Sequence, residues 1–229
     1  MGVFIAIEGG DGSGKATQAS LLEAYFRDEL KKPVLRVSFP QYGKASAIYA
    51  GRYLDGNYGS ADDVHPDIGS LPFAIDRFAA KGDIQAMLDT PDGIVIADRY
   101  VASNLAHQGA KLADPTARHQ FYKEVLELEY HIFSIPKPTL NIVLIVPTDI
   151  AQANVDKKDA STRSYTDKKR DIHEQDASHL DKAKANYEEL CGLYPEEFTA
   201  VQCMDTNGHL RSIESINDEL LSLITPILG

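Results

Sequence analysis

The sequence contains few cysteines, relatively few basic residues and no long apolar run. Only two of its 229 residues are cysteines, and 23 Lys and Arg residues stand against 34 Asp and Glu residues. Cys191 and Cys203 lack the close spacing of a metal site, and this sparse usage is typical of a reducing compartment. The net charge of −11 argues against a general nucleic-acid-coating protein. It favours a small-molecule ligand whose anionic groups meet local basic residues.

Signals for membrane association are also missing from the sequence. We find no apolar stretch long enough to cross a bilayer and no charged-then-apolar signal peptide. We therefore expect a cytoplasmic protein without nucleic-acid or membrane partners. A chain of this length can bury a substantial core, and no repeat or linker divides it. We expect a single domain over residues 1–229.

A glycine-rich loop follows the first apolar run, residues 3–7, which predicts a buried strand. Apolar residues at helical spacing predict a helix after the loop. Glycines let backbone N–H groups wrap an anion, and the following helix N-terminus favours negative charge. The pattern Gly9-x-x-x-x-Gly14-Lys15 matches a phosphate-binding P-loop, and its context argues against a glycine turn with a stray lysine. The expected ATP-binding residues are Gly9, Gly10, Gly12, Ser13, Gly14, Lys15, Ala16 and Thr17.

One position departs from the P-loop motif. Ala16 stands where Ser or Thr normally offers a hydroxyl to Mg²⁺. Thr17 follows, but consecutive helical side chains point about 100° apart, so it is not an automatic substitute. The motif therefore predicts phosphate binding and leaves the hydroxyl ligand of the metal unassigned.

Four further apolar runs, residues 34–39, 94–97, 140–146 and 199–204, predict strands that alternate with helices. The helices are expected at residues 45–54, 67–89, 115–133, from 148, 177–191 and 210–224. This alternation predicts an α/β three-layer sandwich with a mainly parallel five-stranded sheet.

Residues just past the carboxyl ends of parallel strands line the ligand crevice of such sheets. Tyr42 follows the second predicted strand, and Asp98 and Arg99 follow the third. A carboxylate can organise a metal, and a guanidinium can grip a phosphoryl oxygen. The alternatives are a surface tyrosine and a structural ion pair. Further polar residues continue this lining: Ser103, Asn104, His107 and Gln108.

Phe73 and Arg77 lie four residues apart in the helix predicted over residues 67–89, and so share one face. An aromatic ring and a guanidinium on one face suit a planar base: the ring can stack on the base, and the arginine can donate hydrogen bonds to it. The alternative places Phe73 in the core with Leu71 and Ile75.

Residues 157–170 are almost free of apolar side chains and rich in positive charge. Such a run is often a solvated surface loop. Beside a P-loop it favours a mobile lid, expected at about residues 154–175, that closes over phosphates. Arg163 and Arg170 are the expected charge-stabilising residues, because a guanidinium binds phosphoryl oxygens in a fork.

Five stretches together resemble the thymidylate kinase family of P-loop nucleoside monophosphate kinases. They are I-E-G-G-D-G-S-G-K-A-T-Q, F-P-Q-Y-G, L-P-F-A-I-D-R-F, D-R-Y-V-A-S-N and D-I-H-E-Q-D after the basic run. The resemblance covers nearly the whole chain and implies a P-loop NTPase fold, a homodimer and the reaction MgATP + dTMP → ADP + dTDP. Two alternatives stay open: a kinase for another nucleoside monophosphate or a deoxynucleoside, and a nucleotide-binding protein without turnover.

The resemblance also implies roles for individual residues. The implied catalytic residues are Lys15, Asp11, Arg99, Arg163 and Arg170, and the implied metal ligands for Mg²⁺ are Asp98 and Asp11. The implied acceptor site contains Asp11, Tyr42, Phe73, Arg77, Arg99, Asn104, His107 and Gln108. Gly12 stands where some members carry a charge-stabilising arginine. The resemblance therefore assigns charge stabilisation to the arginines of the lid. His107 stands where relatives often place an aromatic residue near the 2′ side of the sugar.

Overall fold

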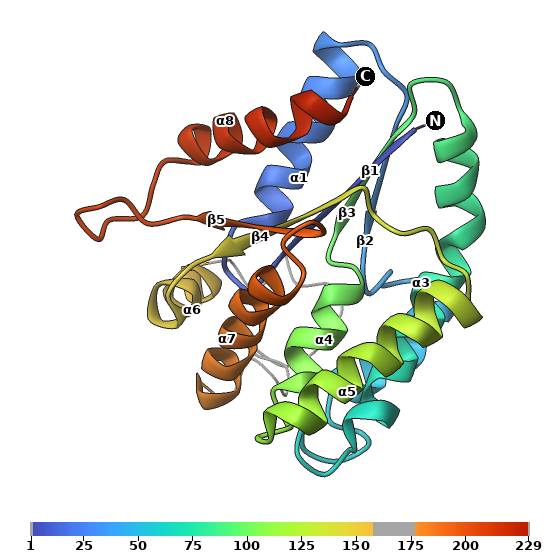
Figure 1. Ribbon diagram of the computed structural model, residues 1–229, viewed down its shortest axis with the longest axis vertical. Helices are drawn as coiled ribbons and strands as arrows, with labels where there is room; N and C mark the ends of the chain where they lie inside the picture. Colours follow the sequence, from blue (N-terminus) through green and yellow to red (C-terminus); the bar gives the residue numbers. More distant parts are fainter. Residues whose placement is uncertain (1, 158–176, 229) are drawn as a thin grey trace.

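All five strands of the sheet run parallel in the computed structural model, which describes residues 2–157 and 177–228 (Figure 1). The spatial order is β2-β3-β1-β4-β5, so the first strand of the chain lies at the centre. The strands are β1 (Val3–Gly9), β2 (Val34–Ser38), β3 (Ile94–Asp98), β4 (Leu140–Ile145) and β5 (Phe198–Gln202). This confirms the predicted parallel five-stranded sheet.

Helices connect the strands in the expected alternation. The α-helices are α1 (Lys15–Ala24), α2 (Ile48–Leu54), α3 (Pro66–Asp89), α4 (Val101–Gly109), α5 (Pro115–Leu126), α6 (Thr148–Lys157), α7 (Ala177–Leu193) and α8 (Ile213–Ile224). Short 3₁₀ turns cover Ala45–Ala47 and Thr225–Ile227, and π-helical turns cover Tyr25–Glu29 and Glu127–Ile132. Within the described ranges, no helix is both long and apolar enough to span a bilayer.

Three helical segments differ from the sequence-based expectation. Helix α4 was expected only as a polar lining, although its polar residues recur at the helical spacing 103, 104, 107, 108. The helix expected over residues 115–133 changes to a π-helix after Leu126. The last helix begins at Ile213, three residues later than expected, because the Ser212 side chain caps it by accepting a hydrogen bond from the Ser215 N–H at 3.1 Å.

The sheet is buried on both faces. In β1, Phe4 and Ala6 belong to a core cluster with residues of α3, α4, α5 and α7. Their neighbours Ile5 and Ile7 belong to a second cluster with α1 and α8. Figure 1 shows these two groups of helices on opposite sides of the sheet. Every residue of β1 is buried, as expected for a central strand of a parallel sheet.

The carboxyl ends of β1, β2 and β3 meet at one edge of the sheet. The Arg99 N–H donates to Ile7 O at 3.0 Å, and the Phe39 N–H donates to Asp98 O at 3.0 Å. These bonds extend the ladder just past the strands and hold the following loops together. The edge therefore gathers the P-loop, the segment after β2 and the start of α4.

Candidate active site at the carboxyl edge of the sheet

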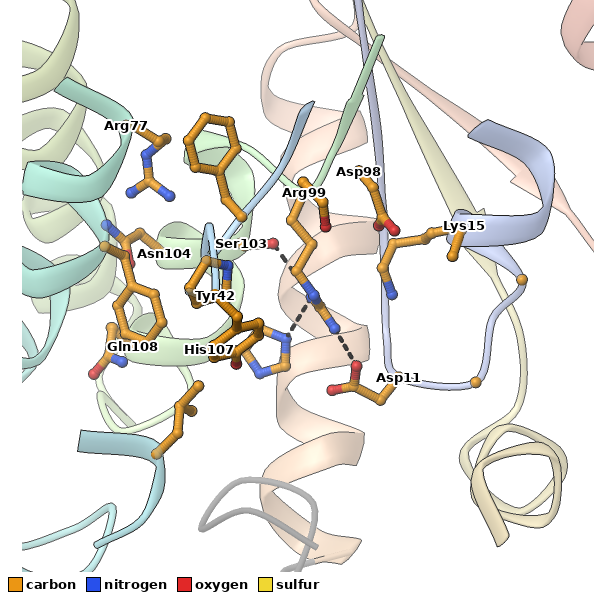
Figure 2. Close-up of a pocket in the computed structure, with 18 residues that line it drawn as sticks. Asp11, Lys15, Tyr42, Arg77, Asp98, Arg99, Ser103, Asn104, His107 and Gln108 are labelled. Atoms are coloured by element: carbon orange, nitrogen blue, oxygen red, sulfur yellow. Dashed lines mark hydrogen bonds and ion pairs between the residues drawn. The ribbon is translucent and has the colours of Figure 1, made fainter. Parts of the chain in front are cut away.

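A cavity of about 260 Å³ opens at this edge (Figure 2). Its walls come from the P-loop and α1, the end of β2, helices α2, α3 and α4, and the end of β3. The lining residues are Asp11, Gly12, Gly14, Lys15, Ala16, Ser38, Phe39, Pro40, Tyr42, Leu54, Phe73, Arg77, Asp98, Arg99, Ser103, Asn104, His107 and Gln108. The structure thus brings the predicted acceptor residues and much of the P-loop to one cavity.

Several predicted residues lie elsewhere. Gly10 and Ser13 line a smaller cavity of about 20 Å³ formed with α6 and α7. Gly9 ends β1, and Thr17 is exposed on α1 outside the lining of both cavities. Most of the predicted lid, with Arg163 and Arg170, falls outside the described residues. Their roles stay predictions.

The P-loop adopts a conformation that requires glycine at Gly12. This residue has φ of +80°, and a Cβ added to it would lie 2.0 Å from Ala151 O in α6. Helix α6 also anchors the loop through Asn154, whose Nδ2 donates to Gly12 O at 3.0 Å. No arginine side chain fits at this position while α6 stays in place.

Lys15 is buried at the foot of the loop, where its Nζ donates to Gly10 O at 2.7 Å. Burial and, after it, the charge of nearby Arg99 lower the pKa of Lys15 to about 8, against the opposing charges of Asp11 and Asp98. The lysine therefore lacks a full counter-charge, and an anionic ligand would supply one.

Arg99 connects the end of β3 to the P-loop. Its φ of +67° lies in the left-handed region, and its guanidinium forms a short ion pair with Asp11. The Nη1 group lies 3.3 Å from Gly9 O, 3.3 Å from Ser103 Oγ and 3.5 Å from His107 Nε2. Burial opposes ionisation of Asp11, but the charge of Arg99 holds its pKa well below the usual range. Figure 2 shows this cluster at the centre of the cavity wall.

Glu8 is a functional neighbour that the sequence reasoning missed. It is fully buried in β1 and accepts hydrogen bonds from Tyr100 N at 2.7 Å, Ser103 Oγ at 2.8 Å and Tyr187 OH at 3.2 Å. Burial raises the pKa of this carboxyl. Glu8 joins β1 to the start of α4 and to α7, and so positions the polar face of α4. A glutamate at the end of an apolar strand was the signal in the sequence.

The far end of the cavity contains Phe73 and Arg77. Phe73 lines the cavity and packs edge-to-face on Tyr53 with ring centroids 5.8 Å apart. Phe73 is half-buried and belongs to neither core cluster, and Ile75 is 47% exposed, so the alternative that placed Phe73 in the core with Leu71 and Ile75 is wrong.

Arg77 is held by Glu129, a second residue that the sequence reasoning missed. The Nε–Oε2 distance is 2.6 Å, the Nη2–Oε1 distance is 2.7 Å, and Nη1 donates to Tyr100 O at 3.1 Å. Asn104 Nδ2 also donates to Glu129 Oε1 at 3.1 Å. One carboxylate therefore orients two polar residues of the lining. Its place on the apolar ridge formed by Leu126, Tyr130 and Phe133 was the only signal in the sequence.

The residues available to a metal ion are few. Within residues 2–157 and 177–228, no group of three or more His, Cys, Asp or Glu side chains could hold a metal. Magnesium usually needs only one or two carboxylates, with phosphates and waters completing its shell. Asp98 lines the cavity, and its carboxylate makes no hydrogen bond or ion pair with another described residue. It fits a metal that arrives with a nucleotide, whereas Asp11 is paired with Arg99.

Comparisons with known proteins agree on one family. The sequence model described as thymidylate kinase matches residues 7–207. The thymidylate kinase of Mycobacterium tuberculosis (strain H37Rv) is 33% identical over 189 residues, which cover 82% of this chain and 85% of that protein. A probable thymidylate kinase of Pyrobaculum aerophilum is 34% identical over 176 residues, which cover 74% and 80%. A solved structure of thymidylate kinase from Candida albicans shares the fold, with a TM-score of 0.68 and 24% identity over 98% of this chain and 92% of that one.

The Glu129 contacts generate a prediction about stability. Replacing Glu129 by Gln keeps the shape but leaves the buried Arg77 charge without its counter-ion, so we expect the free energy of unfolding to fall by about 3 kcal/mol. Urea denaturation measures this change. The matched control is Glu127→Gln, two residues away and 65% exposed. It should change stability by less than about 0.5 kcal/mol, and equal losses in both variants would contradict the assignment.

Proposed function

Because the chain belongs to the thymidylate kinase family, we propose that the cavity residues act in the roles set out below. The protein is an ATP-dependent nucleoside monophosphate kinase that transfers the γ-phosphoryl group of ATP to dTMP and yields dTDP. The observation that best supports these roles is that the P-loop lysine and the Phe73–Arg77 pair line the same cavity. A nucleotide-binding protein without turnover would have little use for the Phe73–Arg77 side of the cavity.

The donor site is the P-loop. Its N–H groups and the N-terminus of α1 would hold the ATP phosphates, with Lys15 as the cation. The buried, under-compensated charge of Lys15 supports this assignment. The proposed ATP-binding residues are the eight already named: Gly9, Gly10, Gly12, Ser13, Gly14, Lys15, Ala16 and Thr17.

The acceptor site is the α3–α4 side of the cavity. Phe73 would stack on the thymine ring, and Arg77 would donate to a base carbonyl with the N–H groups that Glu129 and Tyr100 leave available. Asn104 and Gln108 would complete the base contacts. The sugar and phosphate would lie toward Tyr42, His107, Asp11 and Arg99.

The chemistry requires alignment more than proton transfer. An acceptor phosphate oxygen is already a competent nucleophile near neutral pH, so no strong general base is needed. Lys15 and Arg99 would stabilise the charge that develops on the transferred group. Bound Mg²⁺, held by Asp98 on the protein side, would neutralise phosphate charge. Arg163 and Arg170 are proposed to add cations from the lid, and the lack of space for a side chain at Gly12 supports this division of labour.

We further propose a homodimer formed through α3. Ile68, Ile75 and Phe78 are 59%, 47% and 49% exposed. With Leu71 they follow the spacing 68, 71, 75, 78, which places them on one face of the helix. Three exposed apolar side chains on one helix face, with the half-buried Leu71 among them, are typical of a contact between copies. The cytoplasm is the proposed location, and the free thiols of Cys191 and Cys203 are compatible with it.

The first test is acceptor choice. With MgATP and a panel of dTMP, dUMP, UMP, CMP, AMP and thymidine, we expect ADP release to be fastest with dTMP. A coupled assay of ADP measures it. Preference for thymidine or for another monophosphate would contradict the acceptor assignment. ATP binding without any phosphorylated product would support the non-catalytic alternative.

A second prediction concerns pH. Protonated Lys15 attracts phosphates, and its pKa in the free protein is about 8. Nucleotide binding favours the protonated form, so affinity should be constant below pH 8 and fall above it, by up to about tenfold per pH unit. Titration calorimetry with ADP from pH 7 to 10 measures this dependence. Lys15→Met should bind more weakly with a flat profile, and the same slope in both proteins would contradict the role of Lys15.

A third prediction concerns the dimer. A buried charge at its interface is costly, so Ile75→Asp should convert a dimer of two 25.2 kDa chains into monomers. Sedimentation velocity measures the mass. The matched control is Ile213→Asp, which alters an isoleucine of similar exposure (50%) at the start of α8 and should leave the dimer intact. A monomeric unmodified protein would contradict the proposal.

A further inference from the structure

Because the P-loop hydroxyl is missing, one oxygen ligand of the expected metal is unassigned. Ala16 lines the cavity but offers no oxygen, and Thr17 is exposed outside it. Ser13 lies on the side of the smaller cavity. Among described residues, the serines that line the larger cavity are Ser38 and Ser103, and Ser103 Oγ already donates to Glu8 at 2.8 Å.

Contacts between β2 and α1 locate Ser38 relative to Ala16. Arg36 Nη1 donates to Ser20 Oγ at 2.5 Å, and Arg36 Nε lies 2.8 Å from a Glu23 carboxylate oxygen, so the side chain at position 36 faces α1. Ser38 is two residues further along β2 and has the same orientation, about 7 Å closer to the carboxyl edge. Ala16 is four residues before Ser20, on the same helix face and about 6 Å closer to that edge. Ser38 therefore lies opposite Ala16.

Asp98 is the neighbour of Ser38 on the other side. The two residues are register partners in the parallel β2–β3 pair, so their side chains project from the same face of the sheet. Both line the cavity. Neither the Ser38 hydroxyl nor the Asp98 carboxylate makes a hydrogen bond with another described side chain or backbone group. Two oxygen ligands that lack a hydrogen-bond partner among the described residues thus adjoin the start of the P-loop helix, and the Asp98 carboxylate also interacts electrostatically with Lys15 and Arg99.

We propose that Ser38 supplies the hydroxyl that Ala16 lacks, so that Ser38 Oγ and the Asp98 carboxylate form the protein's share of the magnesium shell. Hard oxygen donors suit Mg²⁺, which keeps phosphate and water ligands as well. The hydroxyl ligand then comes from the adjacent end of β2 and not from the P-loop helix. This inference rests on the proposed ATP site and does not depend on the identity of the acceptor.

Metal binding without an acceptor tests the proposal. Free Mn²⁺, counted by electron paramagnetic resonance, is titrated into the protein saturated with a non-hydrolysable ATP analogue. Ser38→Ala should weaken Mn²⁺ binding to that complex by about tenfold. Ser38→Thr keeps the hydroxyl and should bind Mn²⁺ like the unmodified protein.

Rescue from the P-loop makes the test specific. Adding Ala16→Ser to Ser38→Ala restores a hydroxyl beside the same ion and should recover most of the lost affinity, whereas Ala16→Ser alone should change it little. The matched control is Ser20→Ala, which removes a hydroxyl one helical turn farther from the cavity and should leave Mn²⁺ affinity unchanged.

Two results would overturn the proposal. One is unchanged Mn²⁺ affinity in Ser38→Ala. The other is an equal gain from Ala16→Ser in both backgrounds, which would mean that the two hydroxyls act independently. Because dTMP is absent from the titration, a wrong acceptor assignment would leave this result intact. If the proposed ATP site is wrong, the unmodified protein will not bind the ATP analogue, and this outcome is seen separately from the Mn²⁺ affinity.

Discussion

The partly buried ion pair between Arg99 and Asp11 is the contact on which the rest of the site depends. It joins the end of β3 to the P-loop after β1, and the backbone bond from Arg99 N–H to Ile7 O holds the same junction. Arg99 adopts a left-handed φ there, a conformation that surrounding contacts must stabilise. Removing either charge would leave the other partly buried and without this partner, which is unfavourable. The pair therefore sets the relative position of the donor and acceptor halves of the cavity.

Compensation of buried charge explains which groups remain available to a ligand. Tyr100, Ser103 and Tyr187 donate to Glu8 in the strand, and Glu129 pairs with Arg77 at the base end. These groups are engaged by the protein itself and orient their neighbours. Lys15 keeps an under-compensated charge. An acidic protein thus presents cationic groups where phosphates would lie, which is how net charge and local charge can have opposite signs.

Much of the fold and part of the site could be predicted from local patterns. Apolar runs separated by helical spacing indicated five parallel strands, and glycine spacing with Lys15 indicated the P-loop. Motifs at strand ends assigned Asp98 and Arg99 to the same edge, since parallel strands end together. Helix α4 was missed because its residues were read as a lining, and the π-helical turn after Leu126 has no comparable sequence signal.

The sequence by itself determined most of the elements and the phosphate-binding loop, because each depends on residues close together in the chain, and five short motifs along the chain indicated the family. Only the tertiary structure decided which side chains are paired. Arg77 and Glu129 are 52 residues apart, and Glu8 and Ser103 are 95 apart. It also decided that Ser38 lies opposite Ala16 and that Gly12 has no room for a side chain. Such contacts follow from how strands and helices pack on one another, and the periodicity of a single segment does not identify the segment that packs against it.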